Sequence, residues 1–519
     1  MIEEITITTD PESAATRRLL KMRLAAHLGI EESRINDFKI VRKSVDARQK
    51  KIKVQLSVIM ATDGDTKIPL TFSIKNYPEL NKEAPELIIV GAGPAGLFAA
   101  LRALELGIKP IVIERGDKVE NRREKLAQIS REGIVDPDTN YCFGEGGAGA
   151  YSDGKLFTRS KKRGNVREVL EILHQFGASD DILIESHPHI GSDRLPKIIK
   201  NIRETILEKG GEIRFNEKMT DLILENGEVK GIKTAGGESI KGPVVLATGH
   251  SSKEIYRLLK NKGIDIEAKG FAIGVRLEHP QKEIDSLRYH TKNGRGDFLP
   301  PAEYSFLTRV DNRAVYSFCM CPGGVIVPSM SSPDESVVNG MSASARNGKW
   351  ANSAMVVEIL PEDIPDSKRN ELSLLELQEK LEKDFYLGAN KTLQAPAQKM
   401  TDFIEGKKSD ELPASSYPAG LINCRVDQLL PTFISKRLKE GFRQIEQKNR
   451  GFISDNATVI GLESRTSSPV RITRDPQTLE SVSVKGLYPA GEGAGYAGGI
   501  VSSAIDGMRC VEAYHKTLN

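Results

Sequence analysis

The sequence predicts an α/β fold in which a parallel sheet is interrupted by a second, β-rich domain and preceded by a small α+β module. The first observation is a strand, glycine turn, helix and strand within residues 87–114, the order of a parallel βαβ unit. The second is the return of a strand and a glycine loop near residues 486–499, ahead of a closing helix over 500–518. The third is the different texture of residues 268–450, where scattered strand-like stretches mix with helices. The parallel sheet is therefore expected to be discontinuous in the chain.

The expected domain boundaries follow these changes in pattern. Residues 1–84 form an N-terminal α+β module, residues 85–265 and 455–519 the discontinuous α/β domain, and residues 266–454 an inserted substrate or cap domain. Residues 76–85 are polar, contain two prolines and predict the first linker.

Within the N-terminal module, alternating apolar residues predict strands near 5–8, 37–41 and 52–59, and helical spacing predicts a helix over 13–28. The tip between the last two strands is basic, with Arg42, Lys43, Arg48, Lys50, Lys51 and Lys53. Such a hairpin could contact a nucleic-acid backbone, or it could be a solvated charged edge that discourages strand pairing. The second interpretation is favoured.

The segment Gly91-Ala-Gly93-Pro-Ala-Gly96 follows the first strand of the βαβ unit and opens its helix. Gly91 makes the tight turn, Gly93 lets the backbone approach a pyrophosphate, and Gly96 lets the helix lie close to the strand. The free N–H groups and the dipole of the helix then favour a diphosphate. Glu114 ends the second strand at a spacing that suits hydrogen bonds from both ribose hydroxyls. The expected dinucleotide contacts are Gly91, Gly93, Pro94, Ala95, Gly96, Glu114 and Arg115.

Two further glycine loops indicate FAD as the dinucleotide. FAD is long and needs backbone contact at its pyrophosphate, ribityl chain and flavin ring, whereas NAD needs only the first set. Windows 91–96, 144–154 and 491–499 hold 3, 5 and 5 of the 46 glycines among 519 residues, which accounts for the excess over an average of about 7%. The helix after Gly499 is placed to stabilise the charge of reduced flavin. The further expected cofactor contacts are Gly144, Gly146, Gly147, Gly149, Lys155, Thr248, Gly249, Gly491, Glu492, Gly493, Gly498, Gly499 and Ile500.

The composition excludes several classes of protein. Hydrophobic residues make up 39% and charged residues 28%, which permits a large core, and 74 basic against 71 acidic residues give no field that demands nucleic acid or a membrane surface. Five scattered cysteines do not form a disulfide framework, and no apolar run is long enough to span a bilayer. We therefore expect a cytoplasmic protein without a membrane span or a metal site, and the oligomeric state is left open.

The order of these motifs resembles that of flavoproteins of the glutathione-reductase structural class. Within that class, nearly the whole chain resembles a bacterial family of FAD-dependent dehydrogenases, also described as NAD(FAD)-utilizing dehydrogenase-like. Strings at residues 143–156, 317–324, 339–342, 351–354, 395–398 and 463–471 carry the resemblance. It implies a Rossmann-like FAD-binding domain with a covering substrate domain, and it implies no particular substrate.

Three residues are the catalytic candidates. Cys319-Met-Cys321 is either a redox or nucleophilic pair or an inert pair of buried thiols. Arg465 either holds an anionic substrate group over the flavin or satisfies a local loop network. The sequence has no CxxxxC pair and no second complete βαβ unit, which argues against the dithiol relay of disulfide reductases.

We expect an FAD-dependent oxidoreductase that transfers hydride between an unidentified small-molecule substrate and the flavin, with NAD(P)H as a candidate transient electron donor. Two alternatives stay open. One is a flavin enzyme that acts on RNA through the basic N-terminal module, and the other is a non-catalytic redox sensor that holds FAD.

Overall fold

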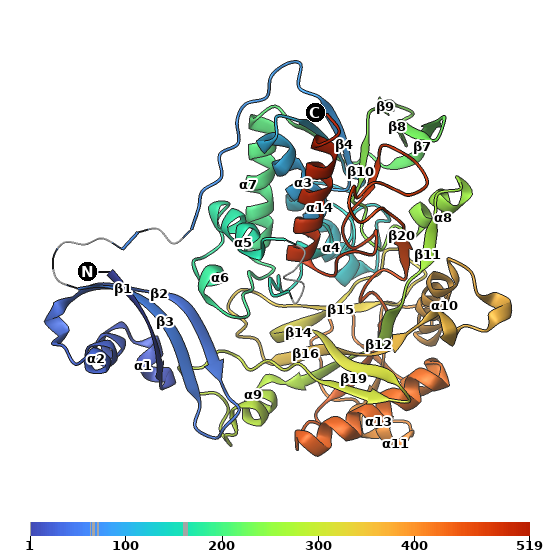
Figure 1. The fold of residues 1–519 in the computed structure, drawn as a ribbon. Helices are drawn as coiled ribbons and strands as arrows, with labels where there is room; N and C mark the ends of the chain where they lie inside the picture. Colours follow the sequence, from blue (N-terminus) through green and yellow to red (C-terminus); the bar gives the residue numbers. More distant parts are fainter. Residues whose placement is uncertain (1, 63, 65–67, 70–71, 159–163, 519) are drawn as a thin grey trace.

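A computed structural model of the chain describes residues 2–62, 64, 68–69, 72–158 and 164–518. The ends of the predicted domains, Met1 and Asn519, lie outside the described residues. Helices and strands alternate and a parallel sheet forms, so the predicted α/β fold is confirmed (Figure 1). Among the helices in these ranges, none is both long and apolar enough to cross a membrane.

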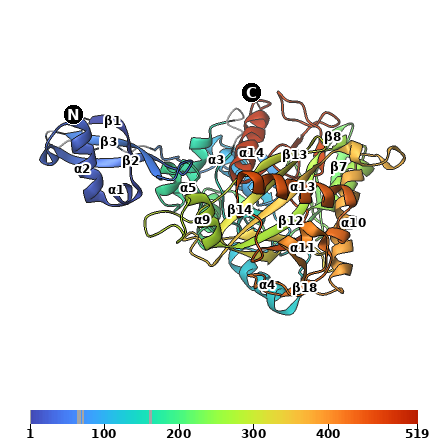
Figure 2. The same ribbon diagram turned by 90° about the horizontal axis from the view of Figure 1, so that it is seen from below.

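The N-terminal module is an antiparallel sheet of three strands in the order β1 (Ile2–Thr9), β3 (Lys53–Thr62) and β2 (Ile35–Asp46). Helices α1 (Pro11–Ala15) and α2 (Arg17–Leu28) pack on it through Leu20 and Leu24, which are buried against Leu56 and Val58. Asp10 caps α1 by accepting a hydrogen bond from the N–H of Ser13 at 2.9 Å. The module projects from the rest of the molecule in both views (Figures 1 and 2).

The second sheet is parallel throughout, with the order β21 (Leu487–Pro489), β10 (Val244–Leu246), β4 (Glu86–Val90), β5 (Lys109–Ile113) and β6 (Glu212–Arg214). Helices α3 (Pro94–Glu105), α7 (Leu195–Glu208) and α14 (Ile500–His515) cover one face. The strands β7 (Met219–Glu225), β8 (Glu228–Thr234) and β9 (Ser239–Lys241) and helix α8 (Lys253–Asn261) cover the other. Both faces are thus buried, which explains the continuous apolar runs of the central strands.

The third sheet runs β13-β14-β16-β12-β19-β17-β18, with β15 paired to β14. The strands are β12 (Phe271–Pro280), β13 (Leu307–Val310), β14 (Arg313–Pro328), β15 (Val338–Met341), β16 (Trp350–Ile359), β17 (Ala395–Lys399), β18 (Leu421–Asn423) and β19 (Thr458–Glu463). Helices α9 (Gln281–Tyr289), α10 (Ser373–Gly388) and α13 (Thr432–Lys448) join its apolar core. The register of β14 against β16 shifts twice between Phe318 and Gly324, so β14 bends where it meets the parallel-sheet domain.

Candidate functional site

The first glycine turn leaves β4 at the carboxyl edge of the parallel sheet and enters α3. Gly91 has a φ of +106°, which L side chains rarely adopt, and its N–H donates to Ile113 O at 2.8 Å. A Cβ on Gly96 would lie 1.8 Å from Gly91 O, so only glycine lets α3 pack this closely. Gly93 is the N-cap of α3 and has no side chain, so no side chain caps the backbone N–H groups of the first helical turn, which lies along a cavity.

Glu114, directly after β5, is buried and accepts three backbone N–H groups. These come from Ala92 at 2.8 Å, Gly116 at 2.9 Å and Gly144 at 3.0 Å. A carboxylate offers about four acceptor sites, so about one remains for a ribose hydroxyl. Glu114 thus also ties the first glycine turn to the Gly144 loop, and its contact with the ribose hydroxyls stays a prediction.

Arg122 of α4 (Val119–Glu132) holds the Gly144 loop from within the protein, and no sequence pattern singled it out. Its side chain is fully buried and donates to five backbone carbonyl oxygens at 2.6–3.4 Å, those of Asn140, Tyr141, Gly144, Glu145 and Gly147. A Cβ on Gly144 would lie 2.4 Å from Arg122 Cδ, so glycine makes room for the arginine stem. One arginine in a highly charged helix carries no sequence signal of such a role.

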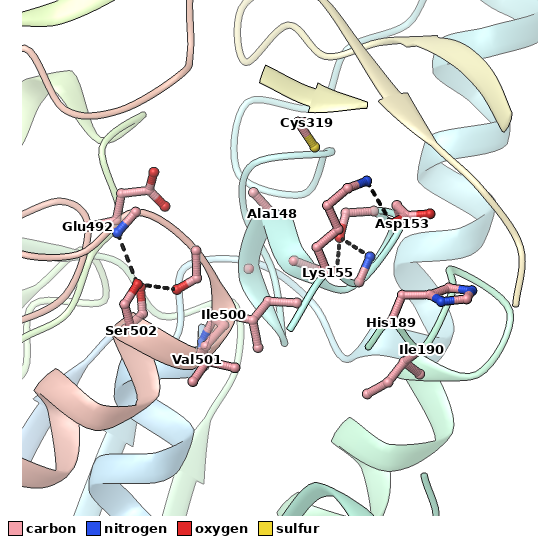
Figure 3. A pocket seen from close by; sticks show the side chains of 18 of the residues that line it. Ala148, Asp153, Lys155, His189, Ile190, Cys319, Glu492, Ile500, Val501 and Ser502 are labelled. Carbon is pink, nitrogen blue, oxygen red and sulfur yellow. Dashed lines mark hydrogen bonds and ion pairs between the residues drawn. The ribbon is translucent and has the colours of Figure 1, made fainter. Parts of the chain in front are cut away.

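The third loop, residues 491–499, runs from β21 into α14. Gly491 N–H donates to Asp506 at 2.8 Å, and a Cβ on Gly493 would lie 2.4 Å from Gly249 O. Glu492 points toward the cavity, where burial raises the pKa of its carboxyl to about 7 (Figure 3). Nδ1 of His250 lies 3.6 Å from Oε1 of Glu492. α14 begins without a capping side chain, so its N-terminal amides are available to a ligand.

The three loops surround one cavity of about 1340 Å³. Ligand pockets commonly measure about 300–1,000 Å³, so this cavity is large enough for a long cofactor and a second molecule. The predicted cofactor contacts that line it are Gly91, Gly93, Pro94, Ala95, Glu114, Arg115, Gly144, Gly147, Gly149, Lys155, Thr248, Gly249, Glu492, Gly498, Gly499 and Ile500.

Four predicted cofactor glycines do not line the cavity. At Gly96, Gly146, Gly491 and Gly493, a Cβ would lie 1.8–2.9 Å from a neighbouring segment. Their predicted role as cofactor contacts is therefore corrected, because they let the three loops pack against one another and against the helices.

The cradle fits FAD. Gly93 and Gly147 are in close contact, since a Cβ on Gly147 would lie 3.2 Å from Gly93 Cα, and both present backbone without a side chain to the cavity. The N-termini of α3 and α14 open on the same cavity and lie close together, because a Cβ on Gly149 would lie 3.6 Å from Pro94 Cγ and 3.2 Å from Ile500 Cγ1. The donor set therefore suits an anionic diphosphate and a ring that becomes anionic on reduction.

The N-terminal module walls the far end of the cavity. Lys43, Ser44, Val45 and Ala47 of β2 line it. Lys43 O accepts the N–H and the hydroxyl of Ser186, both at 3.0 Å, and Lys43 Nζ pairs with a glutamate carboxylate at 2.9 Å. At least one residue of the basic tip thus serves to dock the hairpin on the protein itself, and contact with nucleic acid stays a prediction.

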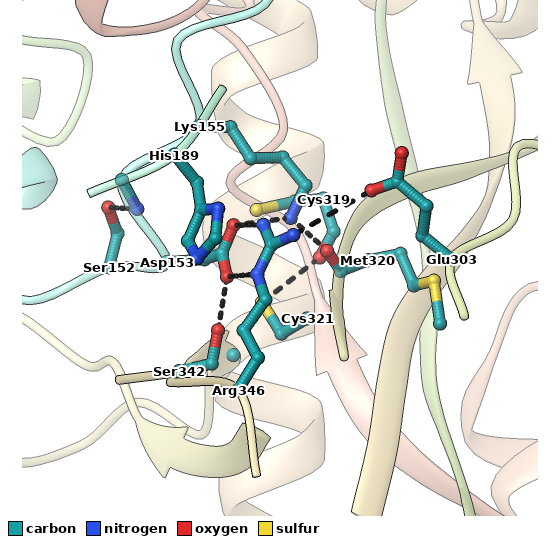
Figure 4. Close-up of polar contacts among 12 residues, drawn as sticks. Ser152, Asp153, Lys155, His189, Glu303, Cys319, Met320, Cys321, Ser342 and Arg346 are labelled. Atoms are coloured by element: carbon teal, nitrogen blue, oxygen red, sulfur yellow. Dashed lines mark hydrogen bonds and ion pairs between the residues drawn. The ribbon is translucent and has the colours of Figure 1, made fainter. Parts of the chain in front are cut away.

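Cys319 of β14 lines the cavity, whereas Cys321 is fully buried and does not line it. Lys155 lies beside Cys319 (Figures 3 and 4). Its ammonium pairs with Asp153 at 2.8 Å and also donates to the backbone of Met320. Lys155 therefore joins the glycine loop of the α/β domain to the inserted sheet.

Arg465 lies in a buried charge cluster. Its guanidinium donates to Glu335 at 2.6 Å, to Glu382 at 3.1 and 3.2 Å, to Cys142 Sγ at 3.0 Å and to a backbone carbonyl. Lys253 binds the same two carboxylates at 2.7 and 2.6 Å. No donor of Arg465 is left for a substrate anion, so a structural role replaces the predicted substrate contact.

Comparison with known proteins agrees with this geometry. Residues 270–466 match the family described as "FAD-dependent protein, C-terminal domain-like", and residues 1–61 match a domain of unknown function. A Clostridium beijerinckii protein, named only as uncharacterized, is 40% identical over 514 residues, which cover 95% of each chain. A 66-residue stretch, 13% of each chain, is 33% identical to a 4,4'-diapophytoene desaturase of a Methylomonas species.

Solved structures show only loose likeness. CtdE in complex with FAD is 13% identical with a TM-score of 0.33, covering 83% of this chain and 84% of its own. A geranylgeranyl bacteriochlorophyll reductase-like protein from Thermoplasma acidophilum is 14% identical with a TM-score of 0.34, covering 84% and 79%. These scores are too low to bear on fold or function, and we draw nothing from them.

Proposed function

Because the chain belongs to the family of FAD-dependent proteins marked by this C-terminal domain, we propose that it is a flavoprotein oxidoreductase that transfers hydride between a small-molecule substrate and FAD. The observation that carries the proposal is the convergence of three glycine loops on one large cavity. Bound FAD would supply hydride acceptance and donation. The protein supplies binding, orientation and the exclusion of water.

The cofactor-binding roles follow from the geometry of the loops. Gly93, with the N-terminus of α3, would hold the diphosphate on backbone amides, whereas Gly91, whose N–H is bonded to Ile113 O, would make the turn that brings them to the cavity. Glu114 would accept one ribose hydroxyl with its remaining acceptor site. Glu492 and the N-terminus of α14 would face the ribityl chain and the flavin, where the helix dipole stabilises negative charge on the reduced ring.

The substrate would enter the far end of the cavity, which all three modules enclose. The N-terminal hairpin contributes Val45, the inserted domain contributes Tyr304 and Phe318, and the α/β domain contributes His189. A second partner must close the redox cycle, and NAD(P)H is our candidate donor. Among the described residues, the Gly91 turn is the glycine loop that joins two strands of the parallel sheet through a helix, and FAD would occupy it. NAD(P)H would therefore have no dinucleotide-binding unit of its own and would bind transiently at the far end of the cavity.

Anaerobic mixing of the purified holoprotein with NADH or NADPH tests the proposed reaction. We expect the flavin absorbance to bleach with saturable dependence on one of the two nucleotides, because hydride transfer requires a bound complex. A holoprotein that neither nucleotide reduces, and that photoreduction does reduce, would exclude the nicotinamide donor. A flavin that no reductant or added metabolite turns over would favour the redox-sensor alternative.

A further inference from the structure

Cys319 and Cys321 lie on β14 where the strand bulges beside the cavity (Figure 4). Cys319 faces the cavity with a φ of +45°, whereas Cys321 is fully buried behind it. Cys321 Sγ donates to Cys319 O at 3.4 Å, so the two cysteines contact each other directly. One of the two thiols is open to the cavity.

The bulge matters because of disulfide geometry. In a regular strand, residues at i and i+2 are about 6.7 Å apart, near the upper end of the roughly 4.4–6.8 Å Cα separation that disulfides span. A bulge bends the strand and redirects its side chains. A non-glycine residue with positive φ is uncommon, and such conformations are typical of functional sites. The backbone at Cys319 therefore departs from a regular strand at the point where the two cysteines contact each other.

Two cations flank the pair. Arg276 is fully buried, donates to Cys319 O at 2.7 Å and lies 3.7 Å from Cys321 Sγ, while Lys155 lies on the cavity side. The hydrogen bond from Cys321, followed by the charges of Lys155 and Arg276, lowers the pKa of Cys319 well below that of a free thiol. The hydrogen bond that it donates and its burial raise the pKa of Cys321. The acidic groups near the pair are Asp153, Glu463 and Glu492.

We propose that Cys319 and Cys321 form a redox-active dithiol that exchanges an electron pair with the flavin, an inference that rests on the proposed FAD site. The Cys319 thiolate and the Cys321 thiol become a disulfide: one S–S bond forms and the Cys321 S–H bond breaks. The electron pair and that proton pass to the oxidised flavin, which becomes the reduced anion. In the reverse direction, reduced flavin opens the disulfide. The pair gives the enzyme a second two-electron store between the cofactor and the far end of the cavity.

Reductive titration of the air-oxidised holoprotein with dithionite under argon tests the proposal. The wild type should take up four electrons per flavin, two for the ring and two for the disulfide. Cys319→Ser and Cys321→Ser should each take up two. Cys424→Ser is the matched control, because Cys424 lies outside the cavity lining and burial raises its pKa to about 11, and this variant should keep four.

Thiol chemistry on the flavin-free protein gives an independent readout. After reduction and removal of the reductant, iodoacetamide should modify Cys319 first, and Lys155→Met should move the pH midpoint of that reaction upward by about one unit. A wild type that binds flavin, takes up only two electrons and has an unchanged thiol count before and after reduction overturns the dithiol while leaving the flavin assignment intact. A protein that binds no flavin at all instead overturns the proposed function.

Discussion

Arg122 gives the most quantitative test of how the glycine loops are held. Replacement by methionine keeps most of the stem's volume and removes the guanidinium. Five backbone carbonyls of residues 140–147 then lose the guanidinium as a donor, three of them from hydrogen bonds of 2.6–2.9 Å, although Gly144 O and Gly147 O keep a backbone donor. The loop that would face the cofactor therefore loses its main attachment to α4.

The expected size of the effect follows from buried hydrogen bonds to a charged group. Each contributes about 1.5–3 kcal/mol, and because the acceptors are neutral carbonyls that water and the relaxed loop can partly satisfy, we expect a net loss of about 3–5 kcal/mol in the free energy of unfolding. For a unit of about 250 residues, 1 kcal/mol lowers the melting temperature by about 2–4 °C. Arg122→Met should therefore melt about 6–20 °C below the wild type and should bind FAD less tightly.

Differential scanning calorimetry and the flavin-to-protein absorbance ratio measure both effects. Arg123→Met is the matched control, because Arg123 is the next residue of the same helix and is exposed. It should leave melting temperature and flavin content within experimental error of the wild type. If Arg122→Met melted within 2 °C of the wild type and retained full flavin, the guanidinium would not be holding the loop, and the reasoning would be refuted.

Three further predictions concern other parts of the molecule. Gly96→Ala should abolish flavin binding and lower soluble yield, as measured by absorbance, because its Cβ would lie 1.8 Å from Gly91 O. Burial raises the pKa of Glu382, but the charges of Arg465 and Lys253 lower it by more, so the pKa of this carboxyl lies below its usual value. Its stabilising effect is present above the unfolded pKa of about 4.5 and is lost as pH falls through the folded pKa. Glu382→Gln should lower the free energy of unfolding at pH 7 by about 3–5 kcal/mol. In urea titrations at different pH values, the variant should also lose less stability than the wild type as the pH falls below about 4.5, and an unchanged loss at low pH would reject the ion cluster. Val45→Asp should undock the N-terminal hairpin, because Val45 packs against the core of the inserted domain and a carboxylate there would be partly buried without a partner. Iodide should then quench the fluorescence of the flavin at least about twofold more strongly. Unchanged quenching would show that the hairpin does not enclose the cavity.

Elements decided by local chemistry could be predicted closely from the sequence. The strand, helix and strand predicted within residues 87–114 correspond to Glu86–Val90, Pro94–Glu105 and Lys109–Ile113. Apolar residues at helical spacing also run through residues 433–448, where α13, Thr432–Lys448, forms. In each case, short-range apolar periodicity and glycine or proline positions determine the element. The same short-range signals predict the three glycine loops.

Contacts between distant segments could not be predicted in this way. Arg122 binds carbonyls 18–25 residues away, and Arg465 is neutralised by glutamates 83 and 130 residues away. Charged residues look alike in a sequence whether they meet a carbonyl, a carboxylate or a substrate. Lys43 belongs by its place in the sequence to a basic hairpin tip, although its partner in the fold is Glu185. Only the folded chain shows which of these charges are already paired.

The central claim, that the glycine cradle binds FAD, is tested most directly at Gly93. Its φ of −77° suits any residue, and a Cβ there would make an ordinary contact of 3.8 Å with Gly147 Cα where both glycines line the cavity. Gly236→Val, at the exposed turn before β9, is the matched control. The account predicts that FAD released from purified wild type and Gly236→Val protein approaches one per chain, and that Gly93→Val folds but binds FAD at least about 100-fold more weakly, a difference of about 2.7 kcal/mol. A wild type that lacks flavin and cannot be reconstituted with FAD, or a Gly93→Val protein that binds FAD as the wild type does, would contradict it.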